Sequence, residues 1–142
     1  MATRRAVLDV TTTVFRKSFT HVSNKYFTIE DLLERPVRYD TFPWLNIGLG
    51  PQNIRYALAG DIEIASRVPI YIVGYCKCEG EDLQCEIADL IDDMSTALRT
   101  NYTDFTAATF SLIDAVFYPY EDEERHEIGW VVAILNFDTG NN

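Results

Sequence analysis

The chain has 142 residues, 47% of them hydrophobic and 13% aromatic, and its formal net charge is −10. This composition excludes a globally disordered chain, and the length predicts a single domain that buries a core of its own. An acidic chain without clustered Lys and Arg is not expected to bind nucleic acid through its phosphates. The longest apolar runs, VPIYIV and GWVVAIL, have the length of strands and are too short to cross a membrane.

The first part of the chain predicts helix and connecting segments. Apolar residues recur at helical spacing between residues 3 and 22, which indicates a helix there. In the following FTIEDLLERP, Thr28 is suited to cap a short second helix that ends at Pro36. Residues 39–44, YDTFPW, indicate a connector, and residues 23–43 as a whole are interpreted as an extended connector or arm.

Residues 44–78 predict three strands. WLNIGL is the first, Ile62 and Ile64 alternate with acidic residues in the second, and VPIYIVGYCKC is the third. The third strand is apolar on both faces, which are Val68, Ile70 and Ile72 on one side and Tyr71, Val73 and Tyr75 on the other. We therefore expect both of its faces to be covered.

The clearest helix is predicted from Asp82 to Leu98. Its apolar residues fall in one stripe at about 100° per residue, and the opposite side carries Glu86, Asp89, Asp92 and Asp93. After a loop at RTNYTD come two strands, TFSLIDAVFYP and IGWVVAILNF, joined by the acidic loop YEDEERHE. The sequence thus predicts one α+β domain over residues 1–142. Its small mixed or antiparallel sheet carries two main helices packed on one face, in the order α-β-β-β-α-β-β.

Three cysteines raise the question of a metal site. Cys76 and Cys78 share one face of a strand, whereas Cys85 falls among the acidic residues of the helix. Structural zinc sites usually have paired Cys-x2–4-Cys spacing and four ligands, which this pattern lacks. The prediction is a strand–helix junction with buried or incidental thiols and no metal. An odd number of cysteines also favours a reducing compartment such as a cytoplasm.

No catalytic constellation stands out in the sequence. The histidines are His21 and His126, without a Cys–His or nucleophile motif at a known spacing. Asp92 and Asp93 are adjacent on a helix face that solvent is expected to cover, and LGPQN lacks the glycine spacing and the lysine of a phosphate loop. We therefore expect no enzyme, no catalytic residue and no cofactor.

The last predicted strand is also apolar on both faces, with Trp130, Val132 and Ile134 on one and Val131, Ala133, Leu135 and Phe137 on the other. The two helices account for one face of the sheet. For the second face three coverings stay open: the arm at residues 23–43, a sheet that curls on itself, or a neighbouring subunit.

The order of these elements resembles a known family. A leading helix is followed by FPWLNIGL, then LAGDIEIASR, then VPIYIVGYCK, then the acidic helix EDLQCEIADLIDDMSTALRT and a closing hairpin that ends with GWVVAILNFDT. This order is similar to that of the tail terminator (tail completion) proteins of long-tailed bacteriophages, over about residues 3–138. Residues 23–43 depart from the pattern, since they are longer than the family's usual link from helix to first strand.

The resemblance implies a structural virion protein at the tail–neck junction, assembled in the host cytoplasm. It implies a homo-hexameric ring that caps the tail tube, with the tail tube protein and neck or connector proteins as partners. DNA would pass through the lumen without specific binding. The candidate subunit, tube and lumen contacts are Glu121, Asp122, Glu123, Glu124, Tyr39, Phe42, Trp44, Asp89, Asp92 and Asp93.

Other interpretations of the sequence stay open. The acidic residues are equally typical of a solvated hairpin tip and a solvated helix face. The chain could also be another neck or head–tail connector component, or a tail tube subunit. From a different class, a stand-alone small α+β binding domain has the same pattern, and a metal-dependent enzyme is a third and more distant alternative.

Overall fold

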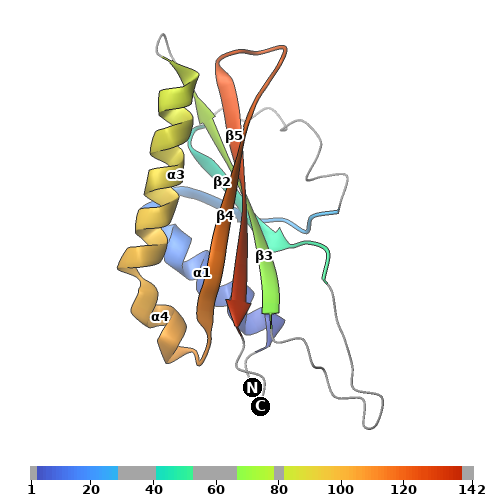
Figure 1. Cartoon of the computed structure of the whole chain (residues 1–142), viewed down its shortest axis with the longest axis vertical. Coiled ribbons are helices and arrows are strands. Elements are labelled where there is room, and N and C mark those ends of the chain that lie inside the picture. The colour runs from blue at the N-terminus through green and yellow to red at the C-terminus, as the bar shows by residue number, and fades with distance from the viewer. Residues whose placement is uncertain (1–2, 29–40, 53–66, 79–81, 139–142) are drawn as a thin grey trace.

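The computed structural model describes residues 3–28, 41–52, 67–78 and 82–138, which form an α+β fold (Figure 1). In chain order the elements are α1 (Arg4–Ser18), β1 (His21–Asn24), β2 (Trp44–Leu49), β3 (Arg67–Lys77), α3 (Leu83–Thr100), α4 (Tyr102–Ala107), β4 (Ser111–Glu121) and β5 (Ile128–Asp138). The fold class predicted from the sequence is therefore confirmed. None of the helices within these ranges is long and apolar enough to span a membrane.

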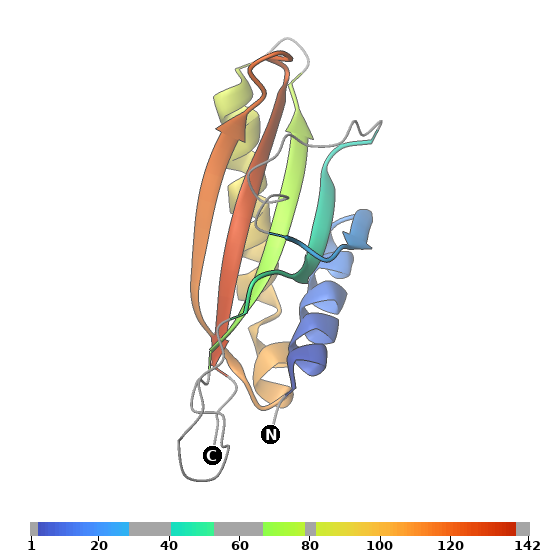
Figure 2. The ribbon, with the colours of Figure 1, turned by 90° about the vertical axis from the view of Figure 1, so that its right-hand side faces the viewer.

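The described strands form a five-stranded sheet in the order β1-β2-β3-β5-β4. β1 is parallel to β2, and the other neighbours are antiparallel, so the sheet is mixed, as expected. Figure 2 shows the sheet with the helices behind it. The last strand of the chain, β5, lies inside the sheet between β3 and β4, whereas β4 lies at its edge.

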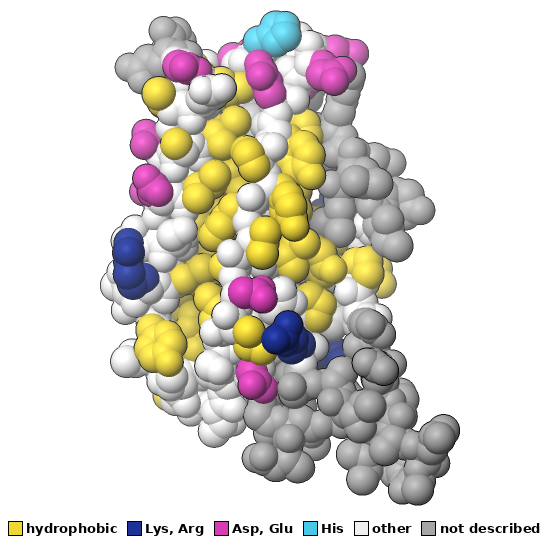
Figure 3. All heavy atoms as spheres, viewed as in Figure 1, with side chains coloured by type: hydrophobic (Ala, Val, Ile, Leu, Met, Phe, Trp, Pro, Cys, Tyr) yellow, Lys and Arg dark blue, Asp and Glu magenta, His cyan; other side chains and the backbone are white. Residues whose placement is uncertain are grey.

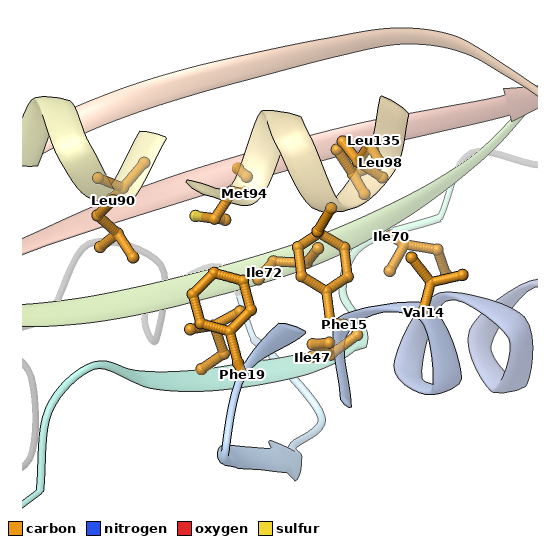
Figure 4. Packing of buried hydrophobic residues seen from close by; sticks show 14 of the residues in the cluster. Val14, Phe15, Phe19, Ile47, Ile70, Ile72, Leu90, Met94, Leu98 and Leu135 are labelled. Atoms are coloured by element: carbon orange, nitrogen blue, oxygen red, sulfur yellow. The ribbon is translucent and has the colours of Figure 1, made fainter. Parts of the chain in front are cut away.

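Both main helices pack on one face of the sheet, which we call the inner face. Phe15 and Phe19 at the end of α1 and Leu90, Met94 and Leu98 of α3 meet over the strands (Figure 4). The apolar stripe predicted for α3 is the side that is buried, and the alternation predicted for β5 places Val131, Ala133, Leu135 and Phe137 in this core. Burial of this apolar stripe stabilises the helices on the sheet.

The first helix is shorter than the sequence predicts. The side chain of Thr3 caps it by accepting a hydrogen bond from the Ala6 N–H at 3.1 Å, but it ends at Ser18, and Phe19 is already extended. Residues His21–Asn24 form β1, and the Asn24 amide bonds both Thr12 Oγ1 of α1 and the Ile47 carbonyl of β2. These tertiary contacts outweigh the helical spacing of the apolar residues.

The prediction of a loop at RTNYTD is also wrong, because residues Tyr102–Ala107 form the short helix α4. Phe105 anchors this helix in the core, where it is 1% exposed and lies 5.3 Å from the Phe137 ring. Two further predictions, the helix that begins after Thr28 and the strand at Ile62 and Ile64, lie outside the described residues.

Candidate functional site

The outer face of the sheet, opposite the helices, carries a second apolar cluster. Its buried members are Phe27, Val73, Tyr75, Trp130 and Val132, and Phe42 packs against them. Phe27 is only 2% exposed. The predicted arm at residues 23–43 begins too early, because residues 23 and 24 belong to β1 and pair with β2. Phe27 and Phe42 come from its other described residues, and they pack on the β3–β5 region of the outer face. Of the three coverings left open by the sequence, described residues of the arm thus contribute to this region.

The chain reaches the outer face by passing over Gly48. After β1, the Lys25 N–H donates to the Ile47 carbonyl at 3.0 Å and the Phe27 N–H donates to the Leu49 carbonyl at 2.8 Å. A Cβ atom built on Gly48 would lie 1.6 Å from the Lys25 carbonyl oxygen. The glycine is therefore required by a close backbone approach, and this approach places Phe27 over the sheet.

Towards β4 the outer face is exposed. Val116, Tyr118 and Tyr120 of β4 stand opposite Ile134, Val132 and Trp130 of β5, and they are 40%, 45% and 40% exposed. The Tyr120 ring stacks on Trp130 with the ring centroids 5.5 Å apart. Figure 3 shows the apolar side chains along this edge of the molecule. Because β4 ends the sheet, no described strand pairs with its outward backbone edge.

The acidic hairpin between β4 and β5 contains four of the candidate contact residues. Glu121 lies 3.5 Å from His126, and Glu123 and Glu124 are exposed. Asp122 differs from them: it is 8% exposed, and its carboxylate accepts a hydrogen bond from the Glu124 N–H at 3.0 Å. Asp122 therefore holds the turn, a role that the acidic run in the sequence does not distinguish from that of its neighbours.

Electrostatics at the hairpin also involve Glu127. Its pKa is lowered first by a hydrogen bond from its own backbone N–H and then by Arg125, whose Nε lies 3.2 Å from the Glu127 carboxylate. The Glu127 carbonyl accepts from the Cys78 N–H at 2.7 Å, which ties the hairpin to the end of β3. The hairpin acids thus lie at the end of the sheet where α3 begins (Figure 1).

A groove separates α3 from the segment that precedes β2. One hollow of about 440 Å³ is lined on one side by Phe42 and Pro43 and on the other by Asp93 and Thr96, and it is closed by the end of α1 and by His21. A second hollow of about 160 Å³ continues it to Cys76, Glu86 and Asp89. The structure thus brings together Phe42, Asp89 and Asp93, which are far apart in the sequence.

The remaining candidates lie beside the groove or elsewhere. Trp44 is half-buried, and its ring stacks on His21 with the centroids 5.4 Å apart. Asp92 is exposed and is not among the residues that line either hollow. Tyr39 lies outside the described residues. The groove was not predicted, because no local sequence pattern connects Phe42 with α3.

The cysteines do not form a site with the other described residues. Cys76 and Cys78 are buried, Cys85 is exposed, and all three are free thiols. Burial, with a smaller contribution from Glu86, raises the pKa of the Cys76 thiol to about 11. Within the described ranges, no group of three or more His, Cys, Asp or Glu side chains is placed to hold a metal ion.

The fold and surfaces define a two-layer α+β domain with an acidic hairpin, a groove under α3 and an apolar strand edge. No protein-family model matches the chain, and no curated protein matches it in sequence.

Proposed function

We propose that this chain is a structural subunit of a long-tailed bacteriophage, a ring-forming tail terminator that caps the tail tube and joins the tail to the neck. The observation that carries the proposal is the exposed apolar edge of the sheet at Val116, Tyr118 and Tyr120. A subunit that functions only in a ring buries such a surface against its neighbours, whereas a monomer leaves it in water.

The acidic residues support a passage for DNA rather than a binding site for it. Glu121, Glu123 and Glu124 are exposed at one end of the sheet, near the first turn of α3. In a ring whose lumen is lined by such carboxylates, DNA phosphates are repelled and the duplex slides without sticking. The hairpin is therefore our candidate for the lumen or the tube-facing rim.

Termination then follows from competitive docking. One surface of the ring imitates a tail tube subunit and binds the end of the tube, and the opposite surface does not accept a further subunit. The hairpin and the segment with Phe42 that leads into Trp44, the first residue of β2, are the candidate docking surfaces, because loops at the ends of a sheet are free to project. The same geometry would serve another neck or head–tail connector component or a tail tube subunit.

A second candidate function rests on the groove under α3. Its larger hollow of about 440 Å³ has the size of a small-ligand pocket, and Asp93 and His21 offer polar groups beside Phe42. A stand-alone binding domain would use this groove as a monomer or dimer. The two functions therefore differ in the mass of the assembled protein.

The test is the mass of the purified protein in solution, measured by light scattering after size exclusion at several concentrations, with and without tail tubes. The expected result is a particle of about six times the 16.2 kDa chain mass, either alone or on added tubes. Electron micrographs should then show tubes that stop growing once they are capped. A strict monomer that ignores tubes contradicts the proposal and favours the small binding domain.

A further inference from the structure

We propose that a second copy of this chain docks on the outer edge of β4 through the edge formed by its own β1 and α1, so that subunits join head to tail. This inference deepens the proposed function, on which it rests for the closed ring, by naming the two surfaces that meet.

The β4 edge is built to be paired. It is an 11-residue strand at the end of the sheet, and its exposed side chains include Ile113, Val116, Tyr118 and Tyr120. Proteins usually protect a long edge strand with Lys, with Pro or with a covering segment. β4 has no Lys or Arg, its register shifts between Leu112 and Asp114, and its single Pro119 lies near its other end. No described strand pairs with the outer edge of the stretch between these two irregularities, so its outward backbone N–H and C=O groups can pair with another strand.

Charge distinguishes the two edges of the sheet. The Thr12 hydroxyl accepts a hydrogen bond from the Asn24 amide at 2.9 Å, so the Thr12 face of α1 lies beside β1. Arg5 precedes Thr12 and Arg16 follows it at helical spacing, so both lie on this face, where they are exposed. Asp9 lies between them, 4.0 Å from Arg5. Lys25 follows β1 directly, with its Nζ 5.9 Å from the centroid of the Phe27 ring. Among the described residues, the β1 edge is therefore basic on balance.

The β4 edge has the opposite sign. Its charged side chains are Asp114 and Glu121, both exposed, and Glu123 and Glu124 follow in the hairpin. The acidic β4 edge of one copy therefore attracts the basic β1 edge of another copy, whereas two β4 edges or two β1 edges repel each other. This complementarity identifies a second copy as the partner of β4.

The strand directions agree with this pairing. β1 is parallel to β2, and three antiparallel steps lead from β2 through β3 and β5 to β4. β4 therefore runs antiparallel to β1. Copies placed side by side in the same orientation bring β4 of one against β1 of the next as an antiparallel pair, which continues the sheet. Such a heterologous contact closes into a ring or extends as a filament.

A charge-exchange experiment tests the contact. One variant reverses the acidic edge (Asp114→Lys with Glu121→Lys), and the other reverses the basic edge (Arg16→Glu with Lys25→Glu). Each variant alone then has two edges of like charge, and we expect it to sediment as a monomer where the wild type assembles. When the two variants are mixed in equal amounts and alternate in the assembly, every contact again joins an acidic edge to a basic edge, and we expect assembly to return. Circular dichroism and urea titration verify that both variants are folded.

The outcomes separate the possible contacts. If the variant Arg16→Glu with Lys25→Glu still assembles alone and the variant Asp114→Lys with Glu121→Lys does not, the proposal is overturned in favour of a two-fold β4–β4 pair. Assembly of both variants at wild-type strength places the contact elsewhere and also overturns it. A wild-type chain that stays monomeric at millimolar concentration overturns self-docking altogether.

A further variant keeps the test valid if the double substitutions disturb the fold. Tyr118→Lys adds an edge lysine at a side chain that is 45% exposed, and it should abolish assembly alone. Hydrogen exchange in the wild-type assembly should slow in both β4 and β1. The proposed function fails separately: an assembly that depends on these two edges but never caps tail tubes upholds the contact and contradicts the terminator role.

Discussion

The carbonyl oxygen of Lys25 occupies the space in which a side chain on Gly48 would begin. The separation of 1.6 Å between that oxygen and an ideal Cβ is far below any real contact, and the obstructing atom belongs to the backbone. Gly48→Ala should therefore lower the free energy of unfolding by about 3 kcal/mol or more, because the chain after β1 has to move. Urea denaturation followed by circular dichroism measures the change.

Gly74→Ala is the matched control for this prediction. At Gly74 the nearest atom is the end of the Leu90 side chain, 3.3 Å from the ideal Cβ, and a side chain of this kind moves at low cost. We expect a change of about 1 kcal/mol or less. Equal losses in the two variants would show that the close approach at Lys25 is not what constrains Gly48.

Phe27 should be a stability determinant despite its place outside regular structure. Its ring is 2% exposed on the outer face, so Phe27→Ala removes a large buried side chain and should cost about 3–5 kcal/mol of unfolding free energy. The neighbouring Tyr26 is 71% exposed, and Tyr26→Ala should change the same quantity by about 0.5 kcal/mol or less. A neutral Phe27→Ala variant would mean that the arm does not cover the face in solution.

Cys76 should make the fold less stable at high pH. Its pKa rises from an ordinary 9.0 to about 11 in the folded chain, because burial disfavours the thiolate. The folded chain therefore holds the thiol proton more tightly than the unfolded chain. Stability from this group is full below pH 9 and falls as the pH rises towards 11.

Urea midpoints measured between pH 8 and pH 11 test this dependence. Burial also raises the pKa of Tyr71, which therefore adds its own loss of stability at high pH, so the wild type is compared with Cys76→Ala rather than interpreted alone. The substituted protein should lose part of the downward slope. Cys85→Ala, at an exposed thiol, is the control for removal of a thiol as such. Identical slopes in all three proteins would exclude a contribution from Cys76.

Substitution of the exposed acidic residues of the hairpin should affect the proposed function without affecting the stability of the fold. Replacing Glu121, Glu123 and Glu124 by Gln should alter tube docking or DNA passage and change the unfolding free energy by about 1 kcal/mol or less, since these side chains are exposed. Asp122→Ala should instead cost about 1–3 kcal/mol, because the Glu124 N–H loses its acceptor. Normal tails that join heads and eject DNA with the triple variant would contradict the proposed role.

Regular periodicity made much of the fold predictable. In β5, the alternation of Val131 and Val132 correctly assigned one side chain to each face, and the apolar stripe of α3 correctly identified its buried side. The predicted end of the first helix was wrong. Phe19 and Val22 continue the helical spacing of apolar residues, but the helix ends at Ser18 and Val22 lies in β1, which pairs with β2. Helix α4 was missed because its six residues bury a single side chain, Phe105, which is too little for a periodic signal.

The candidate surfaces were less predictable than the fold. The acidic run gives no sign that Asp122 turns inward, because that depends on the local hydrogen bond to Glu124. Phe42 and Asp93 line the same groove although they lie far apart in the sequence, and no local pattern indicates that they are close in space. The bare β4 edge depends on the strand order, which the sequence did not specify.

The position of β5 has a consequence for synthesis on the ribosome. This strand is the last described element of the chain, yet it lies between β3 and β4 and carries residues of both apolar clusters. Neither cluster is complete without Ile128–Asp138, so the earlier segments cannot fully bury their apolar side chains until this strand has been synthesised. Chains truncated before β5 should therefore require chaperones and be degraded rather than accumulate as partly folded domains.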